Sequence, residues 1–154
     1  MEARNSVTAE FIAVSENEAL ARTIVSVFVL EADPDMELLS DIRTAVSEAV
    51  TNSIIHGYNS CAVSDDGNDN IIKMTCIREN NDLDIYIEDY GCGISDIEKA
   101  MRPMFTTAPE LERSGLGFTI MESFMDYLDV QSKPDEGTVV HMRKSLCIEP
   151  KEQE

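Results

Sequence analysis

Residues 83–89 constrain the fold of this chain more than any other segment. Leu83, Ile85 and Ile87 alternate with side chains that are charged or carry a hydroxyl. This period of two predicts a strand with one buried face and one solvated face. The β-rich segment 71–78 precedes it across the polar turn 79–82, so the two segments are predicted to form a hairpin. A sheet with only one buried face needs a layer of helices against that face.

The longest helix is predicted for residues 34–58. Its apolar side chains recur at steps of three and four residues, which indicates one buried helical face. These residues are Leu39, Ile42, Val46, Ala49, Val50 and Ile54. Asp33 and Pro34 are typical of an N-cap and a first helical position, and Gly57 is expected to end the helix.

An earlier helix is predicted to reach about residue 31. Ser15 and Glu18 precede its apolar residues with the S-x-x-E spacing of a capping box. A third helix is predicted for 116–127, and a short helical segment near 96–101.

The remaining segments complete one predicted domain. We expect an opening strand at 6–14, a loop at 59–70, and a closing hairpin of 128–133 and 138–146. The fold class predicted from this order is a two-layer α+β sandwich, in which a mixed sheet of about five strands is covered on one face by three helices. A chain of 154 residues is long enough for one such core.

The charge of the chain excludes some partners. Thirty acidic and 12 basic residues leave a net charge of −18, which argues against direct binding to nucleic acid or to an anionic membrane. No apolar run approaches the roughly 20 residues that span a bilayer, and the first residues lack the apolar stretch of a signal peptide. We therefore expect a cytoplasmic protein.

The cysteines indicate neither a zinc site nor a disulfide framework. Cys61, Cys76, Cys92 and Cys147 show no C-x-x-C spacing, and the chain has only two histidines. Reduced thiols with a mainly structural role are the expectation.

Glu48 and Asn52 form the first motif with chemical potential. They are four residues apart in the predicted helix, so they lie one turn apart on one face, with His56 at the next turn. Asn offers a neutral oxygen ligand to Mg²⁺, and a Glu that no metal neutralises can act as a general base. Taken alone, such a pair is more often part of a solvated helix face.

Asp89 begins the second motif, Asp-Tyr-Gly-Cys-Gly, where the alternating strand ends. Gly91 and Gly93 can simply make a tight turn, which is the commoner case. They can also let a flat ligand approach the backbone, and Asp89 then accepts a hydrogen bond from an exocyclic amine such as that of adenine.

Gly115 and Gly117 belong to the third motif, Ser-Gly-Leu-Gly, at the start of the predicted third helix. Backbone N–H groups at a helix N-terminus bind phosphate, although many such glycines only join a loop to a helix. A metal ligand, an amine acceptor and a phosphate loop in this order together favour an ATP site. Neither a P-loop nor a G-x-G-x-x-G fingerprint is present.

Three stretches resemble the GHKL ATP-binding superfamily of gyrase, histidine kinases and MutL. They read S-E-A-V-T-N-S-I-I-H-G-Y, D-Y-G-C-G-I and M-F-T-T-A-P-E-L-E-R-S-G-L-G-F-T-I-M. The similarity is greatest to the serine-kinase branch that contains sporulation anti-sigma factors of endospore-forming bacteria, and it covers about residues 5–146. It implies the GHKL ATPase fold in a single kinase domain, residues 1–154.

The resemblance also implies roles for individual residues. Glu48 is implied to be the general base, Asn52 the Mg²⁺ ligand and Asp89 the acceptor of the adenine amino group. The other implied nucleotide contacts are Gly91 and Gly93 in the adenine pocket, Thr106 and Thr107 in the ATP lid, Arg113 at the γ-phosphate, Gly115 and Gly117 at the phosphates, and Thr138 at the adenine.

The function that the resemblance implies uses ATP and Mg²⁺ to phosphorylate a serine of an anti-anti-sigma factor, while the ATP-bound form sequesters a sigma factor of the sigma-F type. Arg22 matches a family arginine that contacts both partners, whereas without the resemblance it would be an ordinary solvated arginine. A homodimer is expected, through a sheet edge near the N-terminal strand.

Two alternatives stay open. A nucleotide-gated sigma-binding module without significant catalysis would not need Glu48 as a base. A detached catalytic domain of a histidine kinase would need a phosphoacceptor histidine on a dimerisation helix, whereas His56 follows Asn52 on its own helix. The acidic residues 65–69 depart from the family pattern, so contacts near 59–70 are not transferred.

Overall fold

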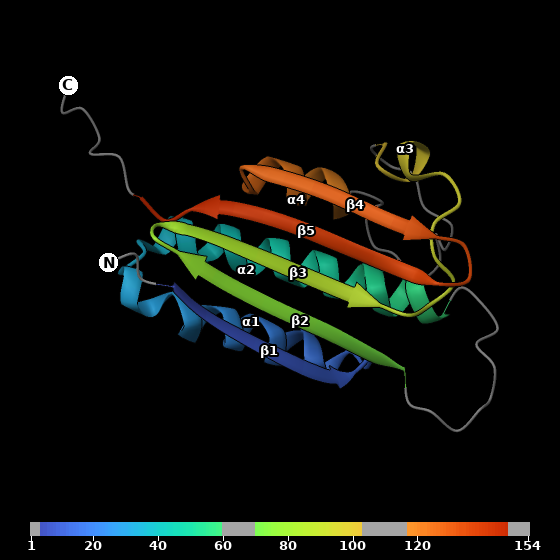
Figure 1. The fold of residues 1–154 in the computed structure, drawn as a ribbon, viewed down its shortest axis with the longest axis horizontal. Helices are drawn as coiled ribbons and strands as arrows, with labels where there is room; N and C mark the ends of the chain where they lie inside the picture. Colours follow the sequence, from blue (N-terminus) through green and yellow to red (C-terminus); the bar gives the residue numbers. More distant parts are fainter. Residues whose placement is uncertain (1–3, 60–69, 103–116, 148–154) are drawn as a thin grey trace.

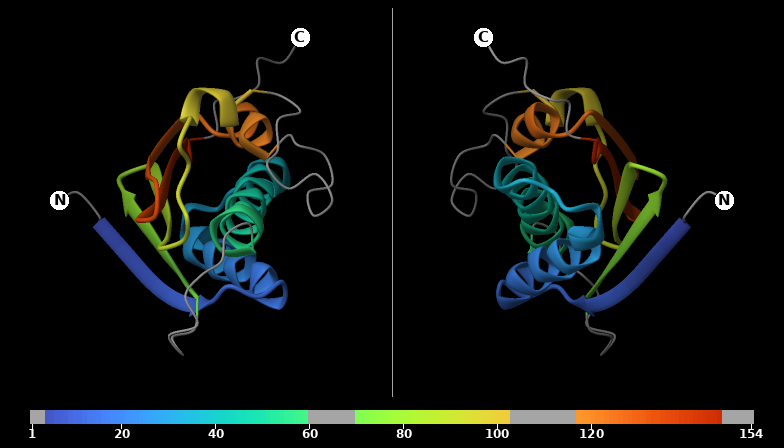
Figure 2. Two further views of the ribbon diagram at one scale, coloured as in Figure 1. Left: turned by 90° about the vertical axis from the view of Figure 1, so that its right-hand side faces the viewer. Right: turned by 90° about the vertical axis from the view of Figure 1, so that its left-hand side faces the viewer.

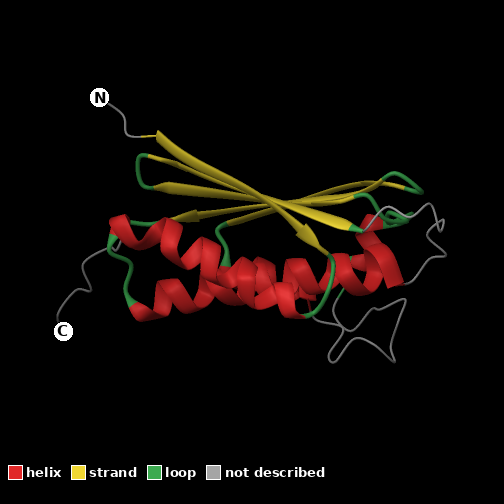
Figure 3. Ribbon diagram, turned by 90° about the horizontal axis from the view of Figure 1, so that it is seen from below, coloured by secondary structure: helices red, strands yellow, loops and turns green. Residues whose placement is uncertain are grey.

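The computed structural model describes residues 4–59, 70–102 and 117–147, which form two layers (Figure 3). A twisted sheet makes one layer and helices make the other (Figure 3). The elements in chain order are β1 (Arg4–Ile12), α1 (Glu16–Val29), η1 (Leu30–Ala32), α2 (Met36–Asn52), η2 (Ser53–Asn59), β2 (Ile71–Glu79), β3 (Asp82–Asp89), α3 (Ile97–Ala100), α4 (Gly117–Phe124), β4 (Tyr127–Lys133) and β5 (Gly137–Ser145). The two-layer α+β class is confirmed, as are both predicted hairpins and the short helix near residue 100.

The sheet has the strand order β1-β2-β3-β5-β4 (Figure 1). Every neighbouring pair is antiparallel, so the prediction of a mixed sheet is wrong. Two long helices, α1 and α2, separate β1 from β2, and the chain therefore returns beside β1 in the opposite direction. The connection that contains α3 and α4 leads from β3 to β4. These two strands run parallel, but they are not neighbours, because β5 lies between them.

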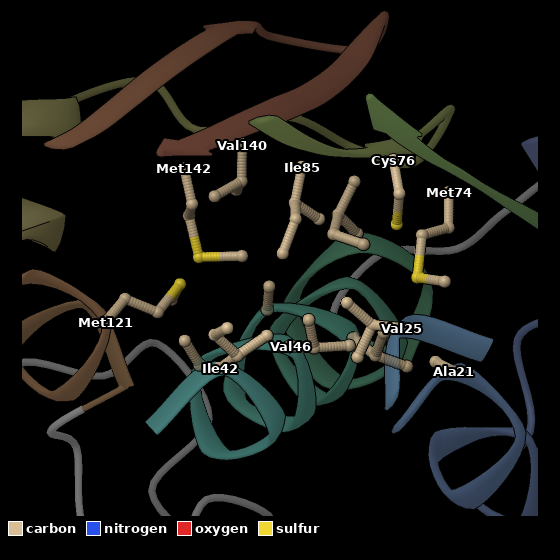
Figure 4. Close-up of a cluster of buried hydrophobic side chains, with 14 of the residues drawn as sticks. Ala21, Val25, Ile42, Val46, Met74, Cys76, Ile85, Met121, Val140 and Met142 are labelled. Atoms are coloured by element: carbon tan, nitrogen blue, oxygen red, sulfur yellow. The ribbon is translucent and has the colours of Figure 1, made fainter. Parts of the chain in front are cut away.

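The core lies between the concave face of the sheet and the helices α1, α2 and α4 (Figure 2). The sheet contributes Met74, Ile85 and Met142, which are almost fully buried and point toward the helices (Figure 4). Val25 of α1 and Val46 of α2 meet them from the helical side (Figure 4). Burying each large apolar side chain contributes about 1.5–3 kcal/mol, which fixes α2 firmly against the sheet.

The start of α1 differs from the predicted capping box. Ser15 precedes the helix but makes no side-chain cap hydrogen bond. The Glu18 carboxylate does not turn back toward Ser15, because it accepts hydrogen bonds from its own helix and from α2 instead. A tertiary contact thus overrides the local capping pattern.

The start of α2 also lies two residues later than predicted. Asp35 is its N-cap, and its side chain accepts a hydrogen bond from the backbone N–H of Leu38 at 2.8 Å. Asp33 ends the 3-10 helix η1 with φ of 50°, a left-handed conformation that an N-cap does not adopt. At its other end α2 continues into the π-helix η2, a type of helix often found at functional sites.

The helices of the described residues are too short or too polar to cross a bilayer. The described cysteines Cys76, Cys92 and Cys147 are free thiols, and Cys61 lies outside the described residues. Burial raises the pKa of Cys76 to about 12, so its thiol stays protonated.

Candidate functional site

A cavity of about 490 Å³ opens beside the end of α2. It is bounded by η2, by the end of β3 and the glycine loop after it, by α3, and by the starts of α4 and β5. Five of the predicted site residues line it: Asn52, Asp89, Gly93, Gly117 and Thr138. The structure therefore brings together residues that are up to 86 positions apart in the sequence (138 − 52 = 86). Such a volume suits a small-molecule ligand.

Asp89 forms the buried end of the cavity. It is only 5% exposed, and its Oδ2 accepts a hydrogen bond from the hydroxyl of Ser53 at 2.9 Å. Its Oδ1 accepts one from the backbone N–H of Gly91 at 3.1 Å. Burial raises the pKa of Asp89, and these hydrogen bonds offset part of that rise. These hydrogen bonds hold the carboxylate in one orientation. A fixed orientation suits a group that accepts a hydrogen bond from a ligand.

The glycines around Asp89 allow backbone segments to touch. A Cβ at Gly91 would lie 1.9 Å from the carbonyl oxygen of Gly57, and that oxygen accepts a hydrogen bond from Cys92 N–H. Gly93 has φ of +72°, and a Cβ there would lie 2.1 Å from the carbonyl oxygen of Lys133. No other residue fits these two positions without moving the backbone. Close backbone contacts therefore support the cavity next to Asp89.

The Asn52 side chain lies against the start of α4. A Cβ at Gly117 would approach both the oxygen and the nitrogen of the Asn52 amide to 3.0 Å. The described residues contain no group of three or more His, Cys, Asp or Glu side chains placed to hold a metal. A magnesium ion that binds here would take one protein ligand, the Asn52 oxygen, together with phosphate and water oxygens, which is a common arrangement for Mg²⁺. The residues present fit Mg²⁺ brought by a nucleotide.

Two serines that the sequence analysis missed support the predicted residues. Ser53, immediately after Asn52, is buried and fixes Asp89 as described above. Ser132 on β4 donates to the carbonyl of Gly137 and therefore accepts from the hydroxyl of Thr138 at 2.8 Å. The same Ser132 oxygen accepts a hydrogen bond from Ile94 N–H at 2.7 Å. Ser132 thus ties Thr138 to the loop after β3.

Lys99 and Arg102 also line the cavity and were not predicted. Asp96 caps α3 by accepting a hydrogen bond from Lys99 N–H, which fixes this short helix at the cavity rim. The cavity lining thus carries two cations, together with the carboxylates of Asp89 and Asp96. The predicted contacts Thr106, Thr107, Arg113 and Gly115 lie outside the described residues.

Glu48 and Arg22 lie in a different place. They line a second, wider groove of about 770 Å³ between α1 and α2, together with Glu18, Ser47 and Thr51. Asn52 and Glu48 are neighbours on α2, but the helix divides the two hollows between them. The predicted site is thus split into a cavity that holds Asn52 and Asp89 and a groove that holds Glu48 and Arg22.

His56 lies on η2 and lines the cavity. A phosphoacceptor histidine would need to stand on a helix that a second kinase domain can reach. His56 is instead half-buried, and the carbonyl oxygen of the same residue accepts a hydrogen bond from the thiol of Cys92 at 3.1 Å. This position does not favour the histidine-kinase alternative.

The combined geometry suits a nucleotide. A fixed buried carboxylate can accept an amine hydrogen bond, main-chain walls can pack against a flat ring, and Asn52 with the rim cations can meet phosphates and a divalent metal. A carboxylate in the adjacent groove, Glu48, can accept a proton from an incoming hydroxyl.

The family model described as a histidine kinase-like ATPase domain matches residues 11–144. The match includes both the cavity and the groove. It therefore agrees with a nucleotide site assembled from α2, β3, α4 and β5.

Curated relatives are similar over nearly the whole chain. The anti-sigma F factor of Clostridium novyi (strain NT) is 49% identical over 142 residues, which is 92% of this chain and 95% of that protein. The anti-sigma F factor of Geobacillus kaustophilus (strain HTA426) is 50% identical over 144 residues, which is 94% of each chain.

A solved structure shares the fold at low sequence identity. The RsbU and RsbW domains of a Mycobacterium tuberculosis protein match with a TM-score of 0.64 and 15% identity, over 92% of this chain and 32% of that longer chain. This likeness supports the architecture alone.

Proposed function

Because this chain belongs to the histidine kinase-like ATPase family, and within it to the anti-sigma F factors, we propose that it is an ATP-dependent protein serine kinase that also sequesters a sigma factor. The sigma factor is of the sigma-F type that acts in sporulation, and the phosphoryl acceptor is a serine of an anti-anti-sigma factor. One observation carries the nucleotide part: a fixed buried carboxylate, Asp89, and a carboxamide, Asn52, line one cavity of about 490 Å³.

In this proposal Asp89 accepts the adenine amino group, and Gly91, Gly93 and Thr138 shape the surrounding pocket. Asn52 binds Mg²⁺, which supplies charge neutralisation and alignment of the phosphates when the nucleotide is bound. Gly117 keeps the start of α4 open next to Asn52, so phosphate can approach the helix N-terminus. We also assign Thr106, Thr107, Arg113 and Gly115, which lie outside the described residues, to the phosphates and the lid.

Glu48 accepts the proton of the acceptor serine in the proposed transfer. It stands on α2 one turn before Asn52 and opens onto the groove, from which a protein can approach. Phosphoryl transfer mainly requires alignment and charge neutralisation, so a side chain of unusual reactivity is not needed. Arg22 lines the same groove and is the proposed contact for both protein partners.

The net charge of −18 supports a basic partner for this chain. An acidic protein attracts a positively charged protein at long range and so raises the association rate at low salt. The on-rate for the sigma factor should therefore fall as salt is raised, and an on-rate that does not change with salt would contradict the idea. We also propose a homodimer and a cytoplasmic location, where the sigma factor would act.

A binding module without catalysis is the second candidate. The lining of the two hollows favours it, because Glu48 lines the groove whereas Asn52, one turn further along α2, lines the cavity. In this case the nucleotide would only control partner binding.

The test is incubation of the protein with labelled ATP, Mg²⁺, the sigma factor and the anti-anti-sigma factor. We expect acid-stable phosphoserine on the anti-anti-sigma factor, and co-purification of the sigma factor only when ATP is present. Nucleotide-dependent co-purification without phosphoserine would replace the kinase with the binding module. Acid-labile phosphohistidine on a partner would replace it with a histidine kinase.

A further inference from the structure

Glu18 does not form the predicted capping box with Ser15. Its carboxylate lies between α1 and α2 instead. Its Oε1 accepts hydrogen bonds from Arg22 Nη1 at 2.8 Å and from Ser47 Oγ at 2.7 Å. Its Oε2 accepts one from Thr51 Oγ1 at 3.0 Å. One carboxylate of α1 is therefore bound by an arginine of its own helix and by two hydroxyls of α2.

The contacts around Arg22 form a closed triangle. Arg22 Nη1 donates to Glu18 and also to Ser47 Oγ at 2.8 Å, and the Ser47 hydroxyl donates to Glu18 in turn. The side chains of Arg22 and Glu18 are 30% and 31% exposed, so both are half-buried in the groove. A simple helical pair at spacing i, i+4 is weak and mobile on a surface. Two anchors on a second helix give this pair a defined position.

The anchors on α2 are next to the residues proposed for catalysis. Ser47 directly precedes Glu48, and Thr51 directly precedes Asn52. Apolar residues of the core fix α2 against the sheet, so the two hydroxyls are a rigid base for the network. The position of Arg22 relative to Glu48 is consequently set through Glu18 and Ser47 and not by α1 alone.

We propose that Glu18 is a positioning residue that holds Arg22 toward the groove, at a fixed place relative to Glu48, for docking of the protein acceptor. The proposal rests on the proposed function, because it takes Arg22 as the residue that touches the acceptor. Glu18 itself acts through Arg22. The free arginine side chain has many rotamers, and fixing one of them before binding lowers the entropic cost of docking.

The experiment compares Glu18→Gln with Glu16→Gln in the phosphorylation assay and in direct binding of the acceptor. Glu16 is a matched control, since it is an exposed acidic residue of the same first helical turn. We expect Glu18→Gln to raise KM and the Kd for the acceptor about 10-fold, the size expected when a hydrogen bond to a charged group is weakened. The maximal rate and the ATP affinity should change by less than about twofold.

A double-mutant cycle with Arg22→Gln tests the coupling. If Glu18 acts through Arg22, Glu18→Gln has no further effect on acceptor Kd once Arg22 is changed. Equal effects of Glu18→Gln in both backgrounds would overturn the proposal, as would a normal acceptor Kd in Glu18→Gln itself. A normal Kd in Arg22→Gln would instead remove the proposed docking role of Arg22, together with the inference built on it.

A second pair of variants keeps the test valid if Glu18→Gln folds poorly. Ser47→Ala and Thr51→Val each remove one anchor of Glu18 and keep its charge. We expect Ser47→Ala to weaken acceptor binding more, because Ser47 also contacts Arg22. Acceptor binding that is unchanged in Ser47→Ala would contradict the positioning role.

Discussion

The cavity and the groove on the two sides of α2 are built differently. Main chain and buried groups form the cavity around Asp89, where glycines let backbone segments touch. Half-exposed side chains joined by hydrogen bonds form the groove around Arg22. A main-chain wall cannot adapt and suits one small rigid ligand, whereas a side-chain network can adjust to the surface of a protein. We therefore propose a small ligand for the cavity and a protein for the groove.

The largest expected effect is a loss of phosphoryl transfer without a loss of ATP binding, which would distinguish the groove from the cavity. Glu48→Ala should lower phosphoryl transfer by on the order of 10²–10⁴, because a positioned base contributes that much. Its ATP affinity should stay within about twofold of the wild type, since Glu48 lines the groove. Single-turnover transfer and calorimetry measure the two quantities, with the exposed Glu37 of α2 changed to Ala as a control. An unchanged transfer rate would remove Glu48 from the reaction.

A second variant tests the rigidity of the cavity wall. Gly91→Ala places a Cβ 1.9 Å from a backbone oxygen and should weaken ATP binding about 10- to 100-fold. Gly117→Ala meets only the Asn52 side chain, at 3.0 Å, and that side chain can rotate. Its loss of affinity should be smaller and should depend on Mg²⁺. Equal losses in both variants, measured by calorimetry, would mean that the wall is not rigid.

A third variant tests whether the buried carboxylate serves ligand binding and not stability. Asp89→Asn should weaken ATP binding about 10-fold, because a charged acceptor is lost. Burial raises the pKa of Asp89 above that of the unfolded chain, so its ionisation destabilises the folded state at neutral pH. The variant should therefore melt at a higher temperature at neutral pH, and this gain should fade as pH falls through the raised pKa of Asp89 and should be absent well below 3.8, where both states are protonated.

Thermal unfolding across pH measures that gain. A lower melting temperature for Asp89→Asn at neutral pH would show that the carboxylate stabilises the fold. Normal ATP affinity in the same variant would contradict the adenine contact.

The smallest effects come from one hydroxyl on each side of α2. Ser53→Ala removes a donor from buried Asp89 and should cost about 1–3 kcal/mol of stability. It should also raise the pKa of Asp89 further, because a hydrogen bond that lowers it is lost. Thr51→Val removes a donor from half-exposed Glu18 and should cost about 0.5–1.5 kcal/mol. Urea unfolding measures both, and a larger loss in Thr51→Val would reverse the comparison.

Periodicity in the sequence was enough to predict the layers of the fold. Alternation at 83–89 and apolar repeats at 34–58 each report one buried face, and both elements have that face in the core. Parallel or antiparallel pairing depends on which strands become neighbours, and no local pattern determines that. The prediction of a capping box was wrong for a related reason. Two of the groups that bind the Glu18 carboxylate are on α2, 29 and 33 residues away in the sequence.

The predicted site was recovered only in part. The motif residues Asn52, Asp89 and Gly93 do meet in one cavity. The separation of Glu48 from them was not predictable, because two residues one turn apart share a face until the neighbouring elements divide it. Ser132 was missed because the predicted strands 128–133 and 138–146 place it beside Val139, whereas the observed register pairs it with Thr138.

Calorimetric titration of the folded protein with ATP in the presence of Mg²⁺ tests the central claim most directly. The account predicts saturable binding of one nucleotide per chain, which Asp89→Asn weakens and Glu16→Gln does not change. If folded wild-type protein gives no binding heat at millimolar ATP and also fails to protect the cavity residues from hydrogen exchange, the cavity is not a nucleotide site and the account is wrong.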